Sequence, residues 1–98
     1  MPEKLTRDAA RRRLLALPGW ELAFNEIKKT YVFGDFAEAL VFVNRVGELA
    51  EEADHHPDIL IKFNRVTLEL STHSAGGITE LDFSLAGLID TRGKPAVR

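Results

Sequence analysis

The stretch VTLELST, residues 66–72, decides the fold class because apolar and polar side chains alternate along it. In an extended strand successive side chains point to opposite faces, so Val66, Leu68 and Leu70 share one face while the other face is polar. A second strand-like run, residues 58–63, precedes it across a two-residue connection, which predicts a β-hairpin. The sequence therefore predicts a sheet that buries one face and leaves the other open.

Working outward from this hairpin, the rest of the chain divides into further helices and strands. Thr6 is a candidate helix cap, and Asp35 followed by Glu38 predicts the start of another helix. The predicted elements are a helix capped by Thr6 that runs to about residue 17, strands over 20–24 and 27–33, a long helix over 36–54, strands over 58–63 and 66–72, and a last helix over 80–90. This αββαββα order predicts a two-layer α+β domain, in which a four-stranded antiparallel sheet carries helices on one face.

Length and composition limit the classes of function. A chain of 98 residues has the length of one domain, so we expect a single domain over residues 1–98, with a flexible tail over 91–98. The 13 Lys and Arg against 15 Asp and Glu leave no positive excess for binding nucleic acid. The sequence has no Cys, which excludes thiolate chemistry and suits a reducing cytosol. Because no long apolar run or signal-peptide pattern is present, we expect a cytoplasmic protein without a membrane segment.

The predicted long helix has more apolar surface than one layer covers. Residues 40–43 are all apolar, and at about 100° per residue they extend most of the way round the helix. We therefore expect Phe42, Val46 and Leu49 to need a second partner besides the sheet, which predicts a homo-oligomer. The same helix is a candidate surface for a protein partner. The alternative is that the first or the last helix covers that side within one chain.

The three histidines lie at two places where predicted elements end. His55 and His56 stand at the C-terminus of the long helix, where the helix dipole favours the imidazolium form, and Glu51 is one turn before His55. His73 follows the fourth strand. A group that exchanges a proton near neutral pH on a firm turn suits general acid–base catalysis. The alternative is that His55 and His56 only complement the helix dipole.

Other chemistries have weaker support. Thr79 and Asp82 have the spacing of a helix cap, so the alternative role of the Asp82 carboxylate is to hold backbone N–H groups. A serine hydrolase is excluded because the sequence has no Gly-x-Ser-x-Gly elbow. The serines near His73 also do not suggest a Ser–His pair, because neighbouring side chains in an extended segment point to opposite faces. Since the sequence has no His-x-His or His-Glu-x-x-His spacing, we expect no metal site.

One set of residues resembles the signature of the pterin-4a-carbinolamine dehydratases. The matching positions, in fixed spacing, are Glu51, His55, His56, Pro57, Phe63, His73 and Asp82. The likeness extends over nearly the whole chain to Gly19-Trp20, Phe33 with Phe36, Ser71-Thr72, and Gly77 with Thr79. Ile59 departs from the aromatic residue that many relatives have two positions after the proline, which concerns pterin packing rather than proton transfer.

This resemblance implies an activity and an assembly. The implied activity removes water from 4a-hydroxytetrahydrobiopterin to give quinonoid dihydrobiopterin, which recycles the pterin cofactor of aromatic amino-acid hydroxylases. No metal or organic cofactor of its own is implied, and the subunits are expected to associate as homodimers or homotetramers. The resemblance also implies the αββαββα fold, in agreement with the pattern of the elements.

Residue roles follow from the same resemblance. His55 and His73 are implied as acids for the two faces of the pterin, and His56 as the residue that binds the ring and assists at N5. Glu51 is expected to orient His55 or hold its charge, and Asp82 to do the same around His73 or to cap the last helix. The implied substrate-binding residues are His56, Phe63, Ser71, Thr72 and His73.

A binding module is the competing function. The same fold resembles a dimerisation cofactor of an animal homeodomain transcription factor and, in some bacteria, factors that assist assembly of the carbon-fixing carboxylase. In that interpretation the helix surface around Phe42, Val46 and Leu49 serves a foreign partner.

Overall fold

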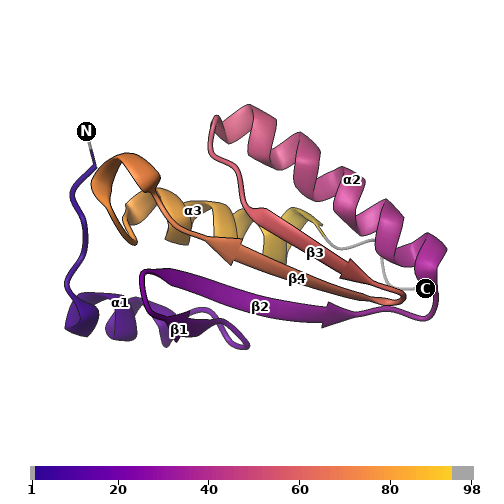
Figure 1. Cartoon of the computed structure of the whole chain (residues 1–98), viewed down its shortest axis with the longest axis horizontal. Helices are drawn as coiled ribbons and strands as arrows, with labels where there is room; N and C mark the ends of the chain where they lie inside the picture. The colour runs from indigo at the N-terminus through magenta and orange to yellow at the C-terminus, as the bar shows by residue number, and fades with distance from the viewer. Residues whose placement is uncertain (1, 94–98) are drawn as a thin grey trace.

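The chain forms three α-helices and four β-strands over residues 2–93, the part that this computed structural model describes. The helices are α1 (Arg7–Leu14), α2 (Phe36–Ala53) and α3 (Glu80–Leu88), and the strands are β1 (Glu21–Ala23), β2 (Glu26–Val32), β3 (Asp58–Lys62) and β4 (Arg65–Leu70). A 3₁₀ turn, η1 (His73–Ala75), and a π-helical turn, η2 (Ile89–Gly93), complete the described chain (Figure 1). None of the described helices is long and apolar enough to cross a membrane.

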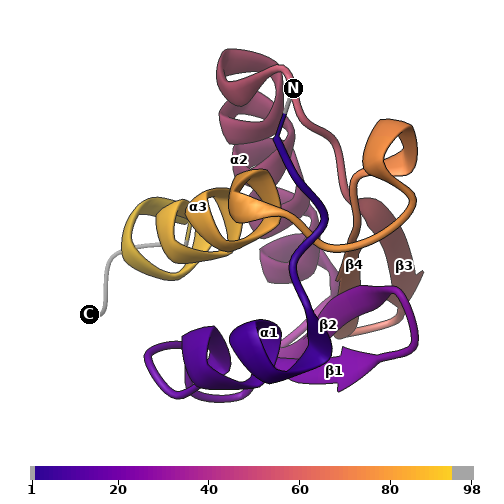
Figure 2. The same cartoon turned by 90° about the vertical axis from the view of Figure 1, so that its left-hand side faces the viewer.

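The four strands form one antiparallel sheet in the order β1-β2-β4-β3. The two longer strands pair at its centre, from Ile27 opposite Leu70 to Val32 opposite Arg65, and β1 and β3 are the edges. The helices lie on one side of the curved sheet and the other side is open (Figure 2). The predicted two-layer αββαββα fold is therefore confirmed.

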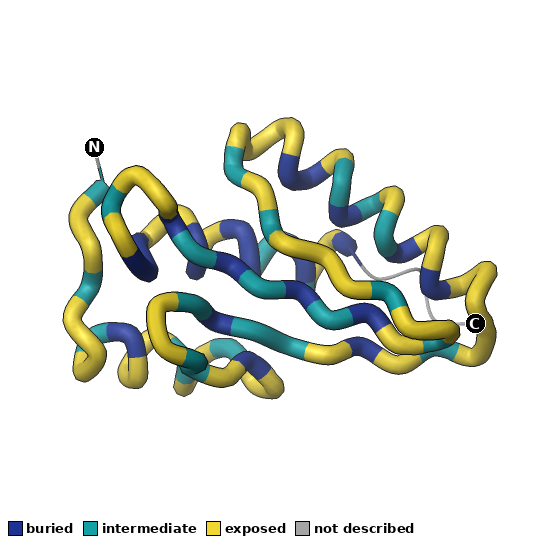
Figure 3. Tube along the Cα trace, in the orientation of Figure 1, coloured by how far each residue is buried: buried dark blue, intermediate teal, exposed yellow. Residues whose placement is uncertain are grey.

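Burial along β4 follows the alternation of its sequence. Val66, Leu68 and Leu70 are each 0% exposed, and residues between them are more accessible (Figure 3). On the open face the Thr30 and Thr67 hydroxyls hydrogen-bond across the two central strands at 2.8 Å. The face of the sheet that the helices cover is thus stabilised by apolar contacts, whereas the open face has polar pairs between neighbouring strands.

Helix α2 differs from the prediction in which of its sides is covered. Phe42, Val46 and Leu49 are at most 1% exposed in the single chain, where they form part of the core. The Phe42 ring centroid lies 4.6 Å from that of Tyr31 and 5.0 Å from that of Phe33. The expectation that these helix residues need a partner subunit is wrong, because a run of apolar residues does not show which side of the helix faces the sheet. The alternative, that the last helix covers this side of the long helix within one chain, holds instead, since α3 and η2 also pack against α2.

The outer side of α2 is the side that keeps apolar surface exposed. Phe36 is 46% exposed, Leu40 38% and Val41 58%. These three residues, rather than the ones expected from the sequence, are available to a second chain.

Two element boundaries also differ from the prediction. Helix α1 ends at Leu14, earlier than expected, and β1 is short because Phe24 turns the chain with a φ of 54°. The start of α2 is as predicted: the Asp35 carboxylate accepts the Glu38 backbone N–H at 2.8 Å. Side-chain caps are local in sequence and were therefore predictable.

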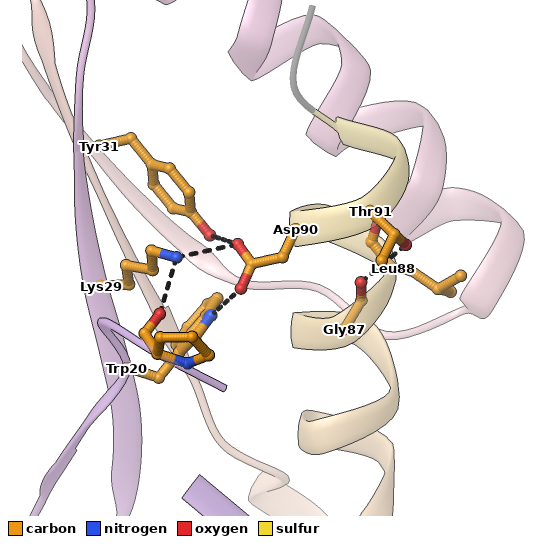
Figure 4. A network of polar contacts seen from close by, with 8 residues as sticks. Trp20, Lys29, Tyr31, Gly87, Leu88, Asp90 and Thr91 are labelled. Atoms are coloured by element: carbon orange, nitrogen blue, oxygen red, sulfur yellow. Dashed lines mark hydrogen bonds and ion pairs between the residues drawn. The ribbon is translucent and has the colours of Figure 1, made fainter. Parts of the chain in front are cut away.

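A polar network fastens the C-terminal turn η2 to the sheet (Figure 4). The Asp90 carboxylate accepts hydrogen bonds from Trp20 Nε1 at 2.9 Å and from the Tyr31 hydroxyl at 2.6 Å. Its Oδ1 atom also pairs with Lys29 Nζ at 3.1 Å. Of the tail expected to be flexible over 91–98, the first three residues belong to η2, and the other residues lie outside the described part of the chain.

Candidate functional site

The fold places the three histidines at one end of the sheet. Because β3 and β4 are antiparallel, the start of β3 and the end of β4 lie side by side. His55 and His56 lead into β3 there, and His73 follows β4 as the first residue of η1. Figure 1 shows η1 and the α2–β3 connection at this same end.

A residue with a left-handed backbone conformation sets the directions in which the side chains of His55 and His56 point. Asp54, with φ 51° and ψ 43°, ends α2, and the His55 backbone N–H donates to the Ala50 carbonyl at 3.1 Å. After this turn the helical spacing is lost, so neighbouring side chains need not follow the helix face. The imidazoles of His55 and His56 accordingly have partners on different helices.

His55 belongs to a buried hydrogen-bond network. Its Nε2 atom lies 2.6 Å from Asp82 Oδ1, and these side chains are 11% and 0% exposed. Asp82 Oδ2 accepts the Thr72 hydroxyl and the Thr79 backbone N–H, both at 2.9 Å. The two threonine hydroxyls are 2.7 Å apart. A carboxylate this deeply buried is stabilised by such donors, and here it has three.

His56 forms the second histidine–carboxylate pair. Its Nε2 atom lies 2.5 Å from Glu51 Oε2, but these side chains are 55% and 77% exposed. The pairing differs from the expectation, because Glu51 contacts His56 rather than His55, and Asp82 contacts His55 rather than His73. The alternative role of Asp82, capping of the last helix, is present, since its carboxylate accepts the Thr79 backbone N–H. The turn at Asp54 explains the exchange, since it turns His55 toward α3 and leaves His56 over the last turn of α2.

The expected substrate-binding residues are not all brought together. Ser71 and the exposed His73 lie at the histidine end of the sheet. Thr72 also lies there, but it is 4% exposed and its hydroxyl already serves Asp82. Phe63 is 68% exposed in the β3–β4 turn, with a φ of 51°, so the length of β3, roughly 16 Å, separates it from the histidines of the same chain.

Carboxylates gather on the open face of the sheet near this end. Carboxylate oxygens of Glu26, Asp58 and Glu69 lie within 4.8 Å of one another. In residues 2–93 this is the group of side chains close enough to share a metal ion, and it contains no histidine. Burial, and then the charges of Glu69 and Asp58, raise the pKa of Glu26, against a smaller opposite effect of Lys28. The group thus adds negative potential beside the histidines.

The histidine end has the parts that proton transfer requires. A carboxylate that accepts a hydrogen bond from one ring nitrogen of a histidine fixes the orientation of the ring, which leaves the other nitrogen placed to give or accept a proton. His55 has such a carboxylate in a buried setting and His56 in an exposed one. The sequence had pointed to both carboxylates. It could not show the link from Asp82 to His55, which joins residues 27 positions apart.

The fold and site define a small two-layer α+β domain with histidine–carboxylate pairs at one end of its sheet. The family model described as pterin 4 alpha carbinolamine dehydratase matches residues 3–92. A Thermomicrobium roseum protein named "Putative pterin-4-alpha-carbinolamine dehydratase" is 62% identical over 73 residues, 74% of this chain and 78% of that protein. A protein of the same name from Acidobacterium capsulatum is 53% identical over 87 residues, 89% of this chain and 95% of that protein. The chain belongs to the pterin 4 alpha carbinolamine dehydratase family.

Two solved structures have the same fold. The crystal structure of a transcriptional coactivator/pterin dehydratase from Brucella melitensis matches with a TM-score of 0.88 and 34% identity, over 93% of this chain and 99% of that one. A pterin dehydratase-like protein described as a RuBisCO assembly factor in the alpha-carboxysome matches with a TM-score of 0.61 and 23% identity, over 78% of this chain and 89% of that one. The second likeness concerns the fold alone.

Proposed function

We propose that this chain is a dehydratase that removes water from 4a-hydroxytetrahydrobiopterin, giving quinonoid dihydrobiopterin and so recycling the cofactor of aromatic amino-acid hydroxylases. The observation that carries the proposal is the pair formed by His55 and the fully buried Asp82, next to the second pair of His56 and Glu51. Membership of the family supplies the substrate class.

The chemistry needs one proton delivered and one removed. The C4a–O bond breaks as the hydroxyl accepts a proton and leaves as water, and N5 loses its proton as the C4a–N5 double bond forms. Hydroxide is a poor leaving group, so an acid beside the oxygen lowers the barrier, and a base beside N5 completes the step. Overall the substrate is converted to product plus water, with no net change in protons or electrons.

The histidines divide this work in the proposal. His55 and His73 act as acids for the two faces of the pterin, and His56 binds the ring and assists at N5. Asp82 orients the His55 ring, and Glu51 orients the His56 ring. The distances of 2.6 Å from His55 Nε2 to Asp82 Oδ1 and 2.5 Å from His56 Nε2 to Glu51 Oε2 support these roles. Ser71 and His73 contribute to binding the substrate.

The proposal includes a homodimer as the working unit. β3 is an edge strand, and its sequence Asp58-Ile-Leu-Ile-Lys62 is complementary to itself in an antiparallel pairing centred on Leu60. In this pairing Asp58 lies opposite Lys62 of the partner subunit, and the partner subunit's Phe63 lies opposite Pro57, beside the histidines. A second chain would thus bring Phe63 to the site from which it is separated within one chain.

Charge exchange tests the homodimer. Lys62→Asp would place two carboxylates opposite each other and should shift the mass measured by sedimentation toward the monomer, whereas Asp58→Lys combined with Lys62→Asp should restore the dimer. A dimer unaffected by the single exchange would contradict pairing through β3.

The activity is tested by stopped-flow absorbance of freshly generated 4a-hydroxytetrahydrobiopterin. The unmodified chain should accelerate dehydration, and His55→Ala should lose on the order of 10²- to 10⁴-fold, the usual contribution of a general acid. Arg11→Ala, a change at an exposed residue of α1, is the control and should retain the full rate. No acceleration by a folded, unmodified chain would refute the dehydratase.

A binding module is the second candidate, and one observation favours it. Phe36, Leu40 and Val41 leave an apolar surface on the outer side of α2. In a binding module this surface takes a foreign protein, and it stays accessible in the chain's own oligomer. Protection of α2 amides from hydrogen exchange in the isolated oligomer would instead assign the surface to self-association.

A further inference from the structure

The buried network around Asp82 has a single arrangement of donors and acceptors. The Asp82 carboxylate can only accept, so the Thr72 hydroxyl donates its one hydrogen to Oδ2. The Thr72 oxygen must then accept from the Thr79 hydroxyl, 2.7 Å away. The Thr79 oxygen in turn accepts the Leu81 backbone N–H at 3.2 Å. Every hydrogen in this chain of contacts therefore points toward Asp82.

The same reasoning fixes the tautomer of His55. Asp82 Oδ1 accepts from the ring nitrogen Nε2, so the neutral imidazole keeps its hydrogen on Nε2. Within residues 2–93 the hydrogen bonding of this ring is confined to Nε2. Nδ1 thus has the free lone pair in the neutral ring and the transferable hydrogen in the protonated ring.

We propose that Thr72 and Thr79 are positioning residues that act through Asp82 to hold His55 in its Nε2–H tautomer, so that Nδ1 is the atom that exchanges the proton with the substrate. The catalytic part rests on the proposed dehydratase function. The tautomer itself does not, because it follows from the contacts alone.

Burial explains why the threonine hydroxyls matter. Thr72 is 4% exposed, and Thr79 and Asp82 are each 0% exposed, so water cannot readily replace a deleted donor. Without the Thr72 hydroxyl, Asp82 Oδ2 keeps only the Thr79 backbone N–H, so one of the two hydrogen bonds that orient the carboxylate toward His55 is lost. Thr79 also caps α3, so Thr72 is the better position at which to separate an effect on His55 from an effect on folding.

Nitrogen NMR of histidine side chains tests the tautomer directly. In protein labelled with ¹⁵N-histidine, long-range proton–nitrogen correlations should show neutral His55 with its hydrogen on Nε2. Thr72→Val, which keeps the shape but removes the hydroxyl, should give a mixture of tautomers at His55. Thr72→Ser should restore the Nε2–H form, and Thr91→Val, a matched change at an exposed threonine, should leave the spectrum unchanged.

A second variant keeps the test decisive if Thr72→Val fails to fold. In Asp82→Asn the amide oxygen is held by the Thr79 N–H, so the amide NH₂ group faces Nε2 and should force His55 to carry its hydrogen on Nδ1. An Nδ1–H form in the unmodified protein would overturn the proposal. So would an unchanged tautomer in Asp82→Asn.

Kinetics separate this proposal from the proposed function. Thr72→Val should lower kcat on the order of 10- to 100-fold, the effect typical of residues that orient metal-binding histidines, and should change KM little. The predicted tautomers combined with an inactive unmodified protein would refute the dehydratase and the catalytic role of Nδ1 together. An active protein whose His55 has the other tautomer would refute only the inference about Thr72 and Thr79.

Discussion

Replacing Asp90 with Ala should strongly destabilise the fold, because this one carboxylate joins η2 to the sheet. It accepts hydrogen bonds from Trp20 Nε1 and the Tyr31 hydroxyl, and pairs with Lys29 Nζ (Figure 4). The Lys29 and Asp90 side chains are only 15% and 17% exposed. Burial and the bond to Asp90 raise the pKa of Tyr31, so its hydroxyl stays a donor.

The expected loss follows from what Asp90→Ala leaves behind. Removing one partner of a buried ion pair typically costs about 3–5 kcal/mol, and a buried indole N–H without its acceptor costs about 1–3 kcal/mol. This loss is reduced because the pair is partly exposed and Lys29 Nζ keeps two other contacts. It donates to the Pro18 carbonyl at 3.0 Å and lies 4.9 Å from the centroid of the Tyr31 ring. We therefore expect a decrease in unfolding free energy of about 3 kcal/mol, or about 12–24 °C in melting temperature for a domain of this size.

Thermal and urea unfolding measure this decrease. Circular dichroism and the fluorescence of Trp20 should give the same transition, at one fixed protein concentration because self-association changes the apparent melting temperature. Asp8→Ala is the control, since Asp8 forms an exposed ion pair with Arg11 at 3.6 Å and should contribute under about 1 kcal/mol. A loss below about 1 kcal/mol in Asp90→Ala would refute the role of the network.

Three further predictions concern the core, the carboxylate group and the histidine turn. Phe42→Ala should lower the unfolding free energy by about 3–5 kcal/mol because Phe42 is buried, whereas Val41→Ala, at an exposed residue, should lower it by under about 1 kcal/mol in the monomer. Equal losses in urea unfolding would show that a different side of α2 faces the sheet. Because the pKa of Glu26 is raised above 4.5, the folded chain binds this proton more tightly than the unfolded chain, and stability falls as the pH rises through the raised pKa. Glu26→Gln should therefore stabilise at neutral pH, by under about 1 kcal/mol because solvent screens much of the repulsion at this largely accessible group, and should change little in acid. Glu52→Gln, the same change at an exposed residue of α2, is the control, and a destabilised Glu26→Gln at neutral pH would contradict this sign. Asp54→Gly should stabilise by about 0.5–1 kcal/mol in thermal unfolding, because glycine adopts the left-handed conformation without strain, and a clear loss would show that the Asp54 side chain itself is needed.

Most of the fold could be predicted because its signals are local. The alternation of Val66, Leu68 and Leu70 gave the buried face of β4, and Asp35 with Glu38 gave the start of α2. The exposed side of α2 could not be predicted, since Leu40 and Phe42 are equally apolar in the sequence. Which of them faces the core depends on how the helix is rotated against the sheet and α3, which is a matter of tertiary packing.

The candidate site could be predicted in its membership more than in its contacts. The histidines and their carboxylates all stand out in the sequence, but the pairing of His55 with Asp82 depends on the left-handed turn at Asp54 and on the position of α3. The role of Thr72 shows the same limit. The resemblance to the family implied that Thr72 contacts the substrate, whereas the residue is buried and its hydroxyl bonds to Asp82.

Titration of the histidine side chains with a stable pterin tests most directly whether the histidine end of the sheet is the pterin site. With ¹⁵N-histidine-labelled protein and 7,8-dihydrobiopterin, saturable shifts should appear at the ring nitrogens of His55, His56 and His73 with one common dissociation constant. Backbone amides of α1, at the opposite edge of the sheet from β3, should stay unshifted. Binding that leaves all three histidines unperturbed, or no binding by the folded protein, would contradict the assignment of this site.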